Sequence, residues 1–226
     1  MDQNLKIWRL ENFNFFLELG MAEKKIIHQN TEMKTIEKDE VVYFQDDLAH
    51  SIYFLKEGRI RISKFNNKGK EFILNILNPG EIFGEASVMG SGIRNEAAIA
   101  EDKVFLCIMK EDKMKELLLQ EPMLNFKFSQ ILEERLEQTQ RRLEDLTFKS
   151  NQQRIIEFLK SSVKTSENNN GVFRINNNLT HDKIAKLTST NRQEVSSVFS
   201  DLKKHRIIDY DRTSIRVLNL EKLESS

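Results

Sequence analysis

The sequence has a single cysteine, Cys107, among its 226 residues. One cysteine excludes a disulfide within the chain and any metal or iron–sulfur site built from several cysteines. No apolar run approaches the roughly 18 residues that a membrane-spanning helix needs. The first ten residues, MDQNLKIWRL, lack the apolar core of a secretory signal. We therefore expect a cytoplasmic protein that does not enter a membrane.

Glycine and proline are scarce, and their distribution is uneven. Four of the eight glycines and one of the two prolines fall in a single stretch, NPGEIFGEASVMGSGIRNEAAIA, over residues 78–100. The formal net charge is zero, but residues 150–226 carry 13 Lys and Arg against 9 Asp and Glu. The earlier part carries the opposite imbalance. A basic C-terminal part favours an anionic partner there.

Residues from about Thr35 to Met109 alternate short β-type runs with turn residues. EVVYFQ, SIYFLKEG, RIRISKF, EFILNIL, EIFGEASVM and KVFLCIM are each of strand length. Gly58, Gly69 and Gly80 recur at a spacing typical of short antiparallel strands joined by turns. This pattern predicts an antiparallel β-roll within an α+β protein. A metal-binding roll needs clustered histidines, and His50 is the only one between Thr35 and Met109, so we expect no metal.

The strand pattern stops at Glu111, and residues 111–148 read as a long helix that Pro122 is well placed to begin. An apolar seam runs along it at spacings of 4, 3, 4 and 3, flanked by charges such as Glu133 and Arg135. Its members are Leu132, Leu136, Thr139, Leu143 and Leu146. Such a seam packs either on its own β domain or on a second copy of the helix, and the heptad spacing favours self-pairing.

Residues 149–226 contain a further helix, KSNQQRIIEFLKSSVK, a polar loop, TSENNNG, and then two short helices and a hairpin. Thr180 is suited to cap the first short helix. Asn191 is suited to cap the second, with Glu194 three residues later completing a capping box. Val195, Phe199 and Leu202 form the buried face of that second helix. Helix, turn, capped helix and hairpin together predict a winged helix-turn-helix.

The exposed face of the second helix carries side chains that donate hydrogen bonds to base edges and phosphates. The residues expected at a DNA interface are Thr180, His181, Asn191, Arg192, Gln193, Ser196, Ser197, Lys203 and Arg212, with Arg216 on the same hairpin. The chain therefore divides into three expected regions. Residues 1–110 form a helical lead-in and the β-roll, residues 111–148 the dimerisation helix, and residues 149–226 the DNA-binding domain.

The order of β-roll, long helix and winged helix resembles the CRP/FNR family of bacterial transcription regulators. The stretches that carry the resemblance are GKEFILNILNPGEIFGE in the roll and LTHDKIAKLTSTNRQEVSSVFSDLKKHRII in the predicted helix-turn-helix. The resemblance implies a homodimer joined by its long helices and bound to double-stranded DNA, with RNA polymerase as a further partner. It also implies a ligand pocket between the roll and the long helix.

The resemblance assigns the pocket to Gly84, Glu85, Arg94, Asn95, Glu96, Thr139 and Gln140. Nucleotide-binding members wrap the glycine turn around the phosphate, and an Arg-Ser pair holds that phosphate. Counting without gaps from Gly84 places Asn95 and Glu96 there, with Arg94 one residue early and so facing the other side. A carboxylate about 4 Å from a phosphate repels it by roughly 4 kcal/mol at an intermediate dielectric. We therefore do not expect cAMP to be the effector.

Other effectors and functions are distinguished by the residues they require. An iron–sulfur sensor needs four cysteines, and a haem sensor needs ligands that are missing because no histidine lies between His50 and His181. Small metabolites such as 2-oxoglutarate, or no ligand at all, stay open. Two alternatives remain beside the leading one: a ligand-binding module whose helix-turn-helix contacts proteins, and a regulator that does respond to a cyclic nucleotide. No catalytic spacing or phosphate-loop lysine indicates an enzyme.

Overall fold

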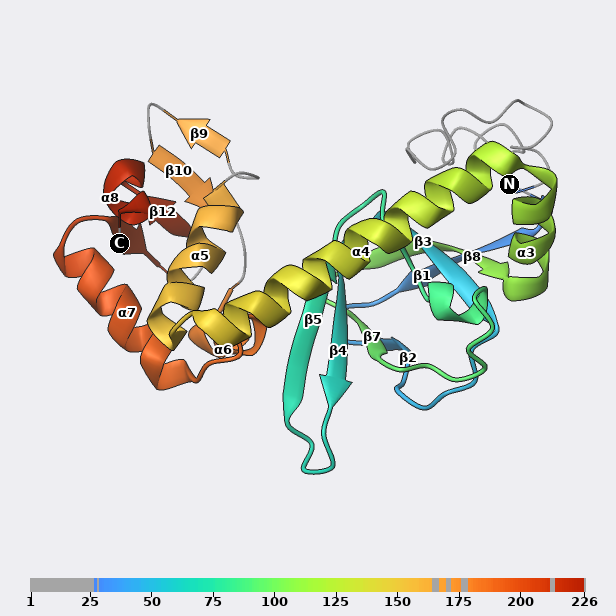
Figure 1. Ribbon diagram of the computed structural model, residues 1–226, viewed down its shortest axis with the longest axis horizontal. Helices are drawn as coiled ribbons and strands as arrows, with labels where there is room; N and C mark the ends of the chain where they lie inside the picture. Colours follow the sequence, from blue (N-terminus) through green and yellow to red (C-terminus); the bar gives the residue numbers. More distant parts are fainter. Residues whose placement is uncertain are drawn as a thin grey trace. The chain divides into compact units, whose positions relative to one another are not determined.

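The computed structural model describes residue 27 and residues 29–163, 167–169, 172–175, 179–211 and 214–225 (Figure 1). The chain divides into two compact units, Met1–Leu136 and Glu137–Ser226. Helix α4 (Pro122–Phe148) contributes residues to both units. The helical lead-in expected at the N-terminus lies largely outside the described residues.

The first unit is built around two four-stranded antiparallel sheets. The first sheet runs in the order β1 (Thr31–Ile36), β8 (Val104–Lys110), β3 (Ser51–Glu57) and β6 (Ile82–Phe83). The second runs in the order β2 (Val41–Tyr43), β7 (Ala97–Ala100), β4 (Ile60–Phe65) and β5 (Glu71–Leu77). Apolar side chains of both sheets, among them Leu55, Ile60 and Leu106, share one buried core. The predicted antiparallel β-roll is confirmed.

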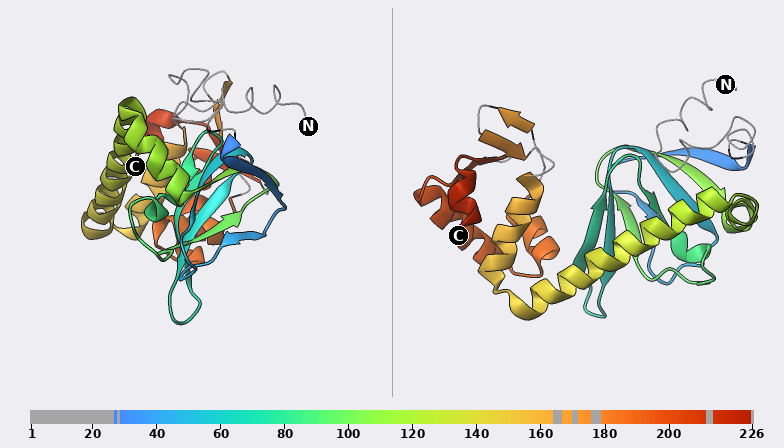
Figure 2. Two further views of the ribbon diagram at one scale, coloured as in Figure 1. Left: turned by 90° about the vertical axis from the view of Figure 1, so that its right-hand side faces the viewer. Right: turned by 45° about the horizontal axis from the view of Figure 1, so that its top comes forward.

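Turn glycines allow these strands to reverse direction. Gly58, Gly69 and Gly80 all have positive φ, at 78°, 72° and 96°. A Cβ at Gly58 would lie 2.5 Å from the backbone oxygen of Lys103, so only glycine fits between the two chain segments. The Gly69 turn closes the β4–β5 hairpin, which extends beyond the other strands of the roll (Figure 2).

The helical stretch after the roll is two helices rather than the single one expected from the sequence. Helix α3 (Glu111–Gln120) ends before Glu121, and α4 begins at Pro122. Proline has no amide hydrogen to continue the α3 ladder, but it fits the first turn of a new helix. Met114, Leu117, Leu124 and Phe128 pack with β3 and β8 side chains in one core cluster. Both helices thereby cover the first sheet.

The second unit packs helices against a small sheet. The helices after α4 are α5 (Asn151–Val163), α6 (His181–Thr188), α7 (Arg192–Lys204) and α8 (Leu220–Glu224). The sheet runs in the order β11 (Ile208–Tyr210), β12 (Ile215–Val217), β10 (Val172–Ile175) and β9 (Glu167–Asn169). The predicted helix–turn–helix and hairpin are confirmed. The polar segment expected to be only a loop instead supplies β9, whose backbone pairs with β10.

No helix among the described residues combines the length and the apolar character needed to cross a membrane.

Candidate functional site

Helices α6 and α7 begin where their capping residues predict. The Thr180 hydroxyl accepts a hydrogen bond from the Lys183 amide at 3.2 Å. Asn191 Oδ1 accepts from the Glu194 amide at 2.9 Å, while Glu194 Oε2 accepts from the Asn191 amide at 3.4 Å. This reciprocal pair satisfies amides that a helix N-terminus otherwise leaves without partners. The capping box fixes the start of α7.

Helix α7 has one buried face and one exposed polar face. Val195, Phe199 and Leu202 are buried in the core of the unit, as expected. Arg192 and Gln193, in the first turn, and Ser197 are exposed. No described carboxylate forms an ion pair with Arg192. The first turn of α7 therefore presents a guanidinium and an amide outward, and these groups hydrogen-bond to guanine and adenine edges in a major groove.

His181 and Ser196, both expected to contact DNA, are bonded to each other. His181 Nδ1 lies 2.9 Å from Ser196 Oγ, and that hydroxyl also donates to the Arg192 carbonyl at 2.9 Å. Since a serine hydroxyl has one hydrogen, the imidazole is the donor in the first bond. The ring also contacts Phe199 and Tyr210. Burial, and secondarily the charge of Arg192, holds the pKa of His181 below its ordinary value. His181 thus braces α7 against α6.

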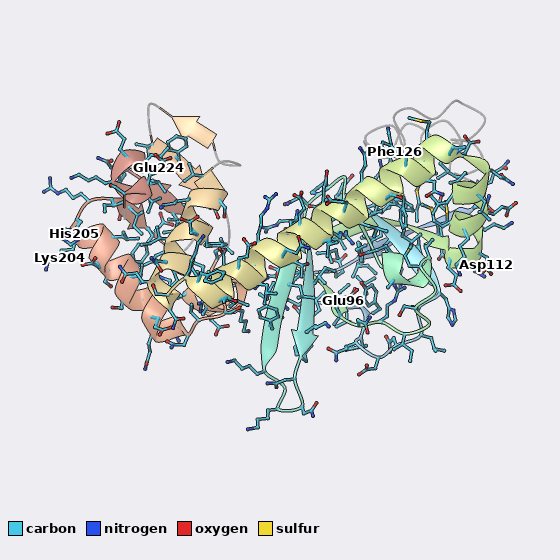
Figure 3. The ribbon with its side chains drawn as sticks, in the orientation of Figure 1. Glu96, Asp112, Phe126, Lys204, His205 and Glu224 are labelled. Carbon is cyan, nitrogen blue, oxygen red and sulfur yellow. The ribbon has the colours of Figure 1, made fainter. Side chains whose placement is uncertain are left out.

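Two basic side chains, one near the end of α7 and one on β12, form ion pairs with the same carboxylate. Lys203 Nζ lies 2.7 Å from Asp209 Oδ1, and Arg216 pairs with Asp209 Oδ2. The hydrogen bond from Lys203 lowers the pKa of Asp209. Lys204 and His205 lie together at the end of α7 (Figure 3). Arg212, expected on the wing, lies outside the described residues. The charge that Lys203 and Arg216 present is therefore partly neutralised within the chain.

In the roll, Arg94 is a buried cation held by backbone carbonyls. Its side chain is 1% exposed. Nη1 donates to the Gly84 carbonyl at 2.9 Å, and Nη2 donates to the Ser51 carbonyl at 2.6 Å. Nε is buried and has no hydrogen-bond partner within the described part of the chain. These carbonyl bonds supply part of the hydrogen bonding that a buried guanidinium needs.

Aromatic rings line the region around this guanidinium. The Arg94 Cζ atom lies 4.3 Å from the centre of the Tyr43 ring and 5.5 Å from that of Tyr53. Tyr53 and Phe83 stack with ring centres 4.9 Å apart. Ring faces attract a cation, so Tyr43 and Tyr53 help to stabilise the buried arginine, and Phe83 packs against both tyrosine rings. Their gathering was not predicted, because β2, β3 and β6 supply one ring each.

Gly84 lies directly beside the guanidinium of Arg94. Its φ is 75°, and a Cβ there would lie 2.7 Å from Arg94 Nη1 and 2.9 Å from Tyr53 Cδ2. The sequence suggested that this glycine lets backbone amides approach a phosphate. In the structure the space beside Gly84 holds the chain's own guanidinium. The left-handed residue also ends β6, so the run EIFGEASVM is a strand only over Ile82–Phe83.

The ungapped count placed Asn95 inside the roll and Arg94 outside, and this orientation is wrong. Asn95 is exposed, whereas Arg94 is buried and Glu96 partly buried. The chain bends at residues 95 and 96, and Arg94 and Glu96 lie close enough for the charge of Arg94 to act on the pKa of Glu96. Tyr43 Oη donates to Glu96 Oε1 at 3.4 Å. Burial, and next the charge of Glu85, raises the pKa of Glu96. Figure 3 shows Glu96 among the strands of the roll.

Glu85 is joined to α4 by an ion pair that the sequence did not reveal. Its Oε1 pairs with Arg135 Nη1, and Arg135 Nη2 donates to the Ile82 carbonyl. Arg135 had been noted only as a charge beside the seam. No local pattern links residues 50 positions apart, so composition and periodicity carried no signal for this contact. The ion pair ties the end of β6 to the helix.

The leucines of the predicted seam of α4 differ in burial. Leu132 is partly buried against the roll core. Leu136, Leu143 and Leu146 are 55%, 65% and 41% exposed. Thr139 and Gln140, expected in the ligand pocket, are exposed residues of α4 within the second unit. Their role in a pocket stays a prediction.

No group of three or more metal-ligating side chains occurs among the residues that the structure describes.

Two family models match the chain in the same order as its two units. The model of the cyclic nucleotide-binding domain matches residues 33–121. The model of the Crp-like helix-turn-helix domain matches residues 153–226. The first match contains the roll with α3, and the second contains the helix-turn-helix with its sheet.

Curated relatives cover most of the chain. It is similar to a cyclic AMP receptor protein of Thermus thermophilus, at 27% identity over 184 residues, covering 81% of this chain and 82% of the relative. It is also similar to a global nitrogen regulator of Synechocystis, at 26% identity over 195 residues, covering 83% and 84%.

Solved structures share the fold at lower identity. A mutant of CooA from Carboxydothermus hydrogenoformans matches with a TM-score of 0.79 at 19% identity, covering 97% of this chain and 94% of that one. The c-di-GMP responsive regulator CLP of Xanthomonas campestris matches with a TM-score of 0.78 at 16% identity, covering 88% and 99%.

The position of Glu96 predicts a pH-dependent cost in stability. A carboxyl whose pKa is raised by folding destabilises the folded state once pH exceeds the pKa of about 4.3 that it has when unfolded. Glu96→Gln stays uncharged, so its free energy of unfolding relative to the wild type should rise between about pH 4 and pH 7. The gain should stay below about 1 kcal/mol because the side chain is partly solvated.

Urea unfolding at a series of pH values measures this difference. Glu134→Gln, a change of an exposed carboxylate on α4, is the control and should track the wild type. Parallel profiles for Glu96→Gln and the wild type would contradict the buried placement of Glu96.

Proposed function

Because the chain belongs to the CRP/FNR family of bacterial transcription regulators, we propose that it is a homodimer that binds a palindromic operator. It acts by binding and not by catalysis. Within the cytoplasm, its action on transcription would involve RNA polymerase as a second partner.

The observation that carries this proposal is the first turn of α7. The capping box of Asn191 and Glu194 holds the helix start, and Arg192 and Gln193 stand exposed on it. A bidentate arginine is the commonest reader of guanine, and a glutamine amide pairs with adenine. Below them, Val195 and Phe199 anchor the helix in the core. A rigid helix with free polar groups at its N-terminus fits a major groove.

The exposed leucines of α4 support the dimer. Leu136 and Leu143 are seven residues apart and both more than half exposed. An apolar row at heptad spacing is covered when a second copy lies along it. A two-fold dimer carries two copies of α7, and the operator would mirror that symmetry.

For the effector site, we propose that no cyclic nucleotide is needed for DNA binding. Both Nη groups of Arg94 are engaged by backbone carbonyls. Two carboxylates, Glu85 and Glu96, lie near enough for one to raise the pKa of the other. An incoming phosphate would meet these negative charges. The effector is then a ligand other than cAMP, or the regulator is active without one.

A second candidate rests on the same arginine. Arg94 points into the roll, and its buried Nε has no described partner, so an anion able to reach Nε would gain a charge-assisted bond. A regulator that does respond to a cyclic nucleotide is favoured by this single feature. The alternative in which the helix-turn-helix contacts only proteins has no feature of its own in its favour.

An electrophoretic mobility shift with genomic DNA fragments tests DNA binding directly. Phosphate contacts release counterions, so affinity should fall steeply as salt rises. Absence of a shifted band at low salt, with folded protein and both with and without added cAMP, would favour the protein-contact alternative.

Arg192→Ala should weaken specific DNA binding by about 1–3 kcal/mol and relax the base preference at one position of each half-site. The reason is the loss of the guanidinium that reads a base edge. Binding to single-base operator variants measures it. Arg141→Ala, on the exposed face of α4, is the matched control. Equal weakening on all sequences would assign Arg192 to a phosphate.

Replacing Leu136 and Leu143 together by glutamate should produce monomers. Two rows of like charges would then face each other across the two-fold axis, out of reach of full solvation. Sedimentation equilibrium measures the mass. The pair Glu134→Gln and Gln138→Glu changes charges on the same helix at exposed positions and should leave the dimer intact. A dimer that persists in the leucine variant would place the interface elsewhere.

Cyclic AMP should not bind the wild-type protein at micromolar concentration, whereas Glu96→Ser should bind it measurably. The substitution removes a carboxylate beside Arg94 and leaves the cation in place. Isothermal titration calorimetry reports both affinities. Tight binding by the wild type, abolished by Arg94→Met, would support the cyclic-nucleotide alternative instead.

A further inference from the structure

One guanidinium in the second unit joins three separate segments of the chain. Arg154, on α5, donates from Nε to the Thr188 carbonyl at 3.0 Å and from Nη2 to the Ser189 carbonyl at 3.1 Å. Nη1 donates to the Lys149 carbonyl at 2.9 Å, and Nη2 also donates to Asn151 Oδ1 at 2.5 Å. Four of the five N–H groups of this side chain are thus engaged. Its partners lie in the α4–α5 connection, at the start of α5 and in the turn before α7.

The turn whose carbonyls accept from Arg154 has a strained backbone, and its carbonyls lie where a helix leaves such groups without hydrogen bonds of its own. Ser189 has φ 55° and ψ 43°, a left-handed conformation that is uncommon for residues other than glycine. The carbonyls of residues 187–189 lie at the C-terminal end of α6, where a helix leaves carbonyls without partners. Arg142 of α4 donates to the Leu187 carbonyl at 2.6 Å. Two cationic side chains therefore hold three successive carbonyls of one turn.

The same arginine reaches the recognition helix by a second route. Asn151, whose Oδ1 accepts from Arg154, donates from Nδ2 to Glu194 Oε1 at 2.6 Å. Glu194 is the acid of the capping box at the start of α7. The α4–α5 connection is thereby linked to α7 in two ways: through the turn that precedes α7, and through the N-terminal cap of α7.

We propose that Arg154 is a positioning residue for DNA recognition, one that fixes the direction of α7 relative to the end of α4. The inference rests on the proposed function. Arg154 contacts no base in this account; it acts through Ser189 and through the Asn151–Glu194 bond. A displacement of the α4–α5 connection moves the Lys149 carbonyl, and Arg154 carries that displacement to both anchors of the recognition helix.

The variant Arg154→Lys distinguishes this positioning role from that of a positive charge alone. An ammonium keeps the charge but not the planar fork that reaches Thr188, Ser189 and Lys149 together. The charge near the DNA face is then unchanged while the geometry is lost. Asn151→Ala is the gentler variant, because it removes the link to Glu194 and leaves the three carbonyl bonds of Arg154 in place.

The test compares two duplexes of equal length: one selected by the wild-type protein from a random-sequence pool, and one scrambled. Arg154→Lys should lower the ratio of specific to nonspecific affinity by about tenfold, the effect of one lost base contact. Affinity for the scrambled duplex and its salt dependence should not change. Asn151→Ala should lower the ratio by a smaller factor. Arg141→Lys, a change of an exposed arginine of α4 that pairs with Glu137 of the same helix, should leave the ratio unchanged.

Two results would overturn the inference. A fall in thermal stability with an unchanged affinity ratio would make Arg154 merely structural. Losses on both duplexes, with a shallower salt dependence, would make it a phosphate contact. If Arg154→Lys does not fold, an unchanged ratio for Asn151→Ala overturns the link through the cap. If the wild-type protein selects no sequence at all, the proposed function itself fails. This outcome differs from a failure of the present inference, which appears only in the variants.

Discussion

The row of leucines along α4 is the constraint from which the functional account follows. Leu136 and Leu143 are 55% and 65% exposed, and Leu146 continues the row at 41%. Each large apolar side chain left in water forgoes roughly 1.5–3 kcal/mol of burial. In the proposed homodimer, a second copy of α4 covers this row at the heptad spacing. Two-fold pairing then requires that the two recognition helices, and the DNA they read, obey the same symmetry.

The interior of the roll has been adapted to hold a cation from its own chain. Arg94 is bonded to the carbonyls of Gly84 and Ser51 and lies over the Tyr43 ring. Gly84 is required because any side chain would displace that guanidinium. The region that matches the cyclic nucleotide-binding domain therefore contains a buried guanidinium bonded by its own backbone carbonyls.

Features set by neighbouring residues were predictable from the sequence. The Thr180 and Asn191 caps, the buried face of α7 and the β-roll all follow from spacings within a few residues, and the structure confirms them. The orientation of Arg94 was predicted wrongly, because residues 94–96 lie outside the strands and bend, so the alternation of faces that holds in a strand does not apply there. The contacts of Arg135 and Arg154 were not predicted at all. Their long-range contacts join residues 34 to 53 positions apart, and only the assembled fold brings these groups together.

Hydroxyl-radical footprinting on a selected operator tests the central claim of a two-fold DNA-binding dimer most directly. The account predicts two protected regions of equal strength on one face of the duplex. Their centres should lie about 34 Å apart, one helical turn, and both should appear at the same protein concentration. A single protected region, or two that fill independently as protein is added, would contradict it.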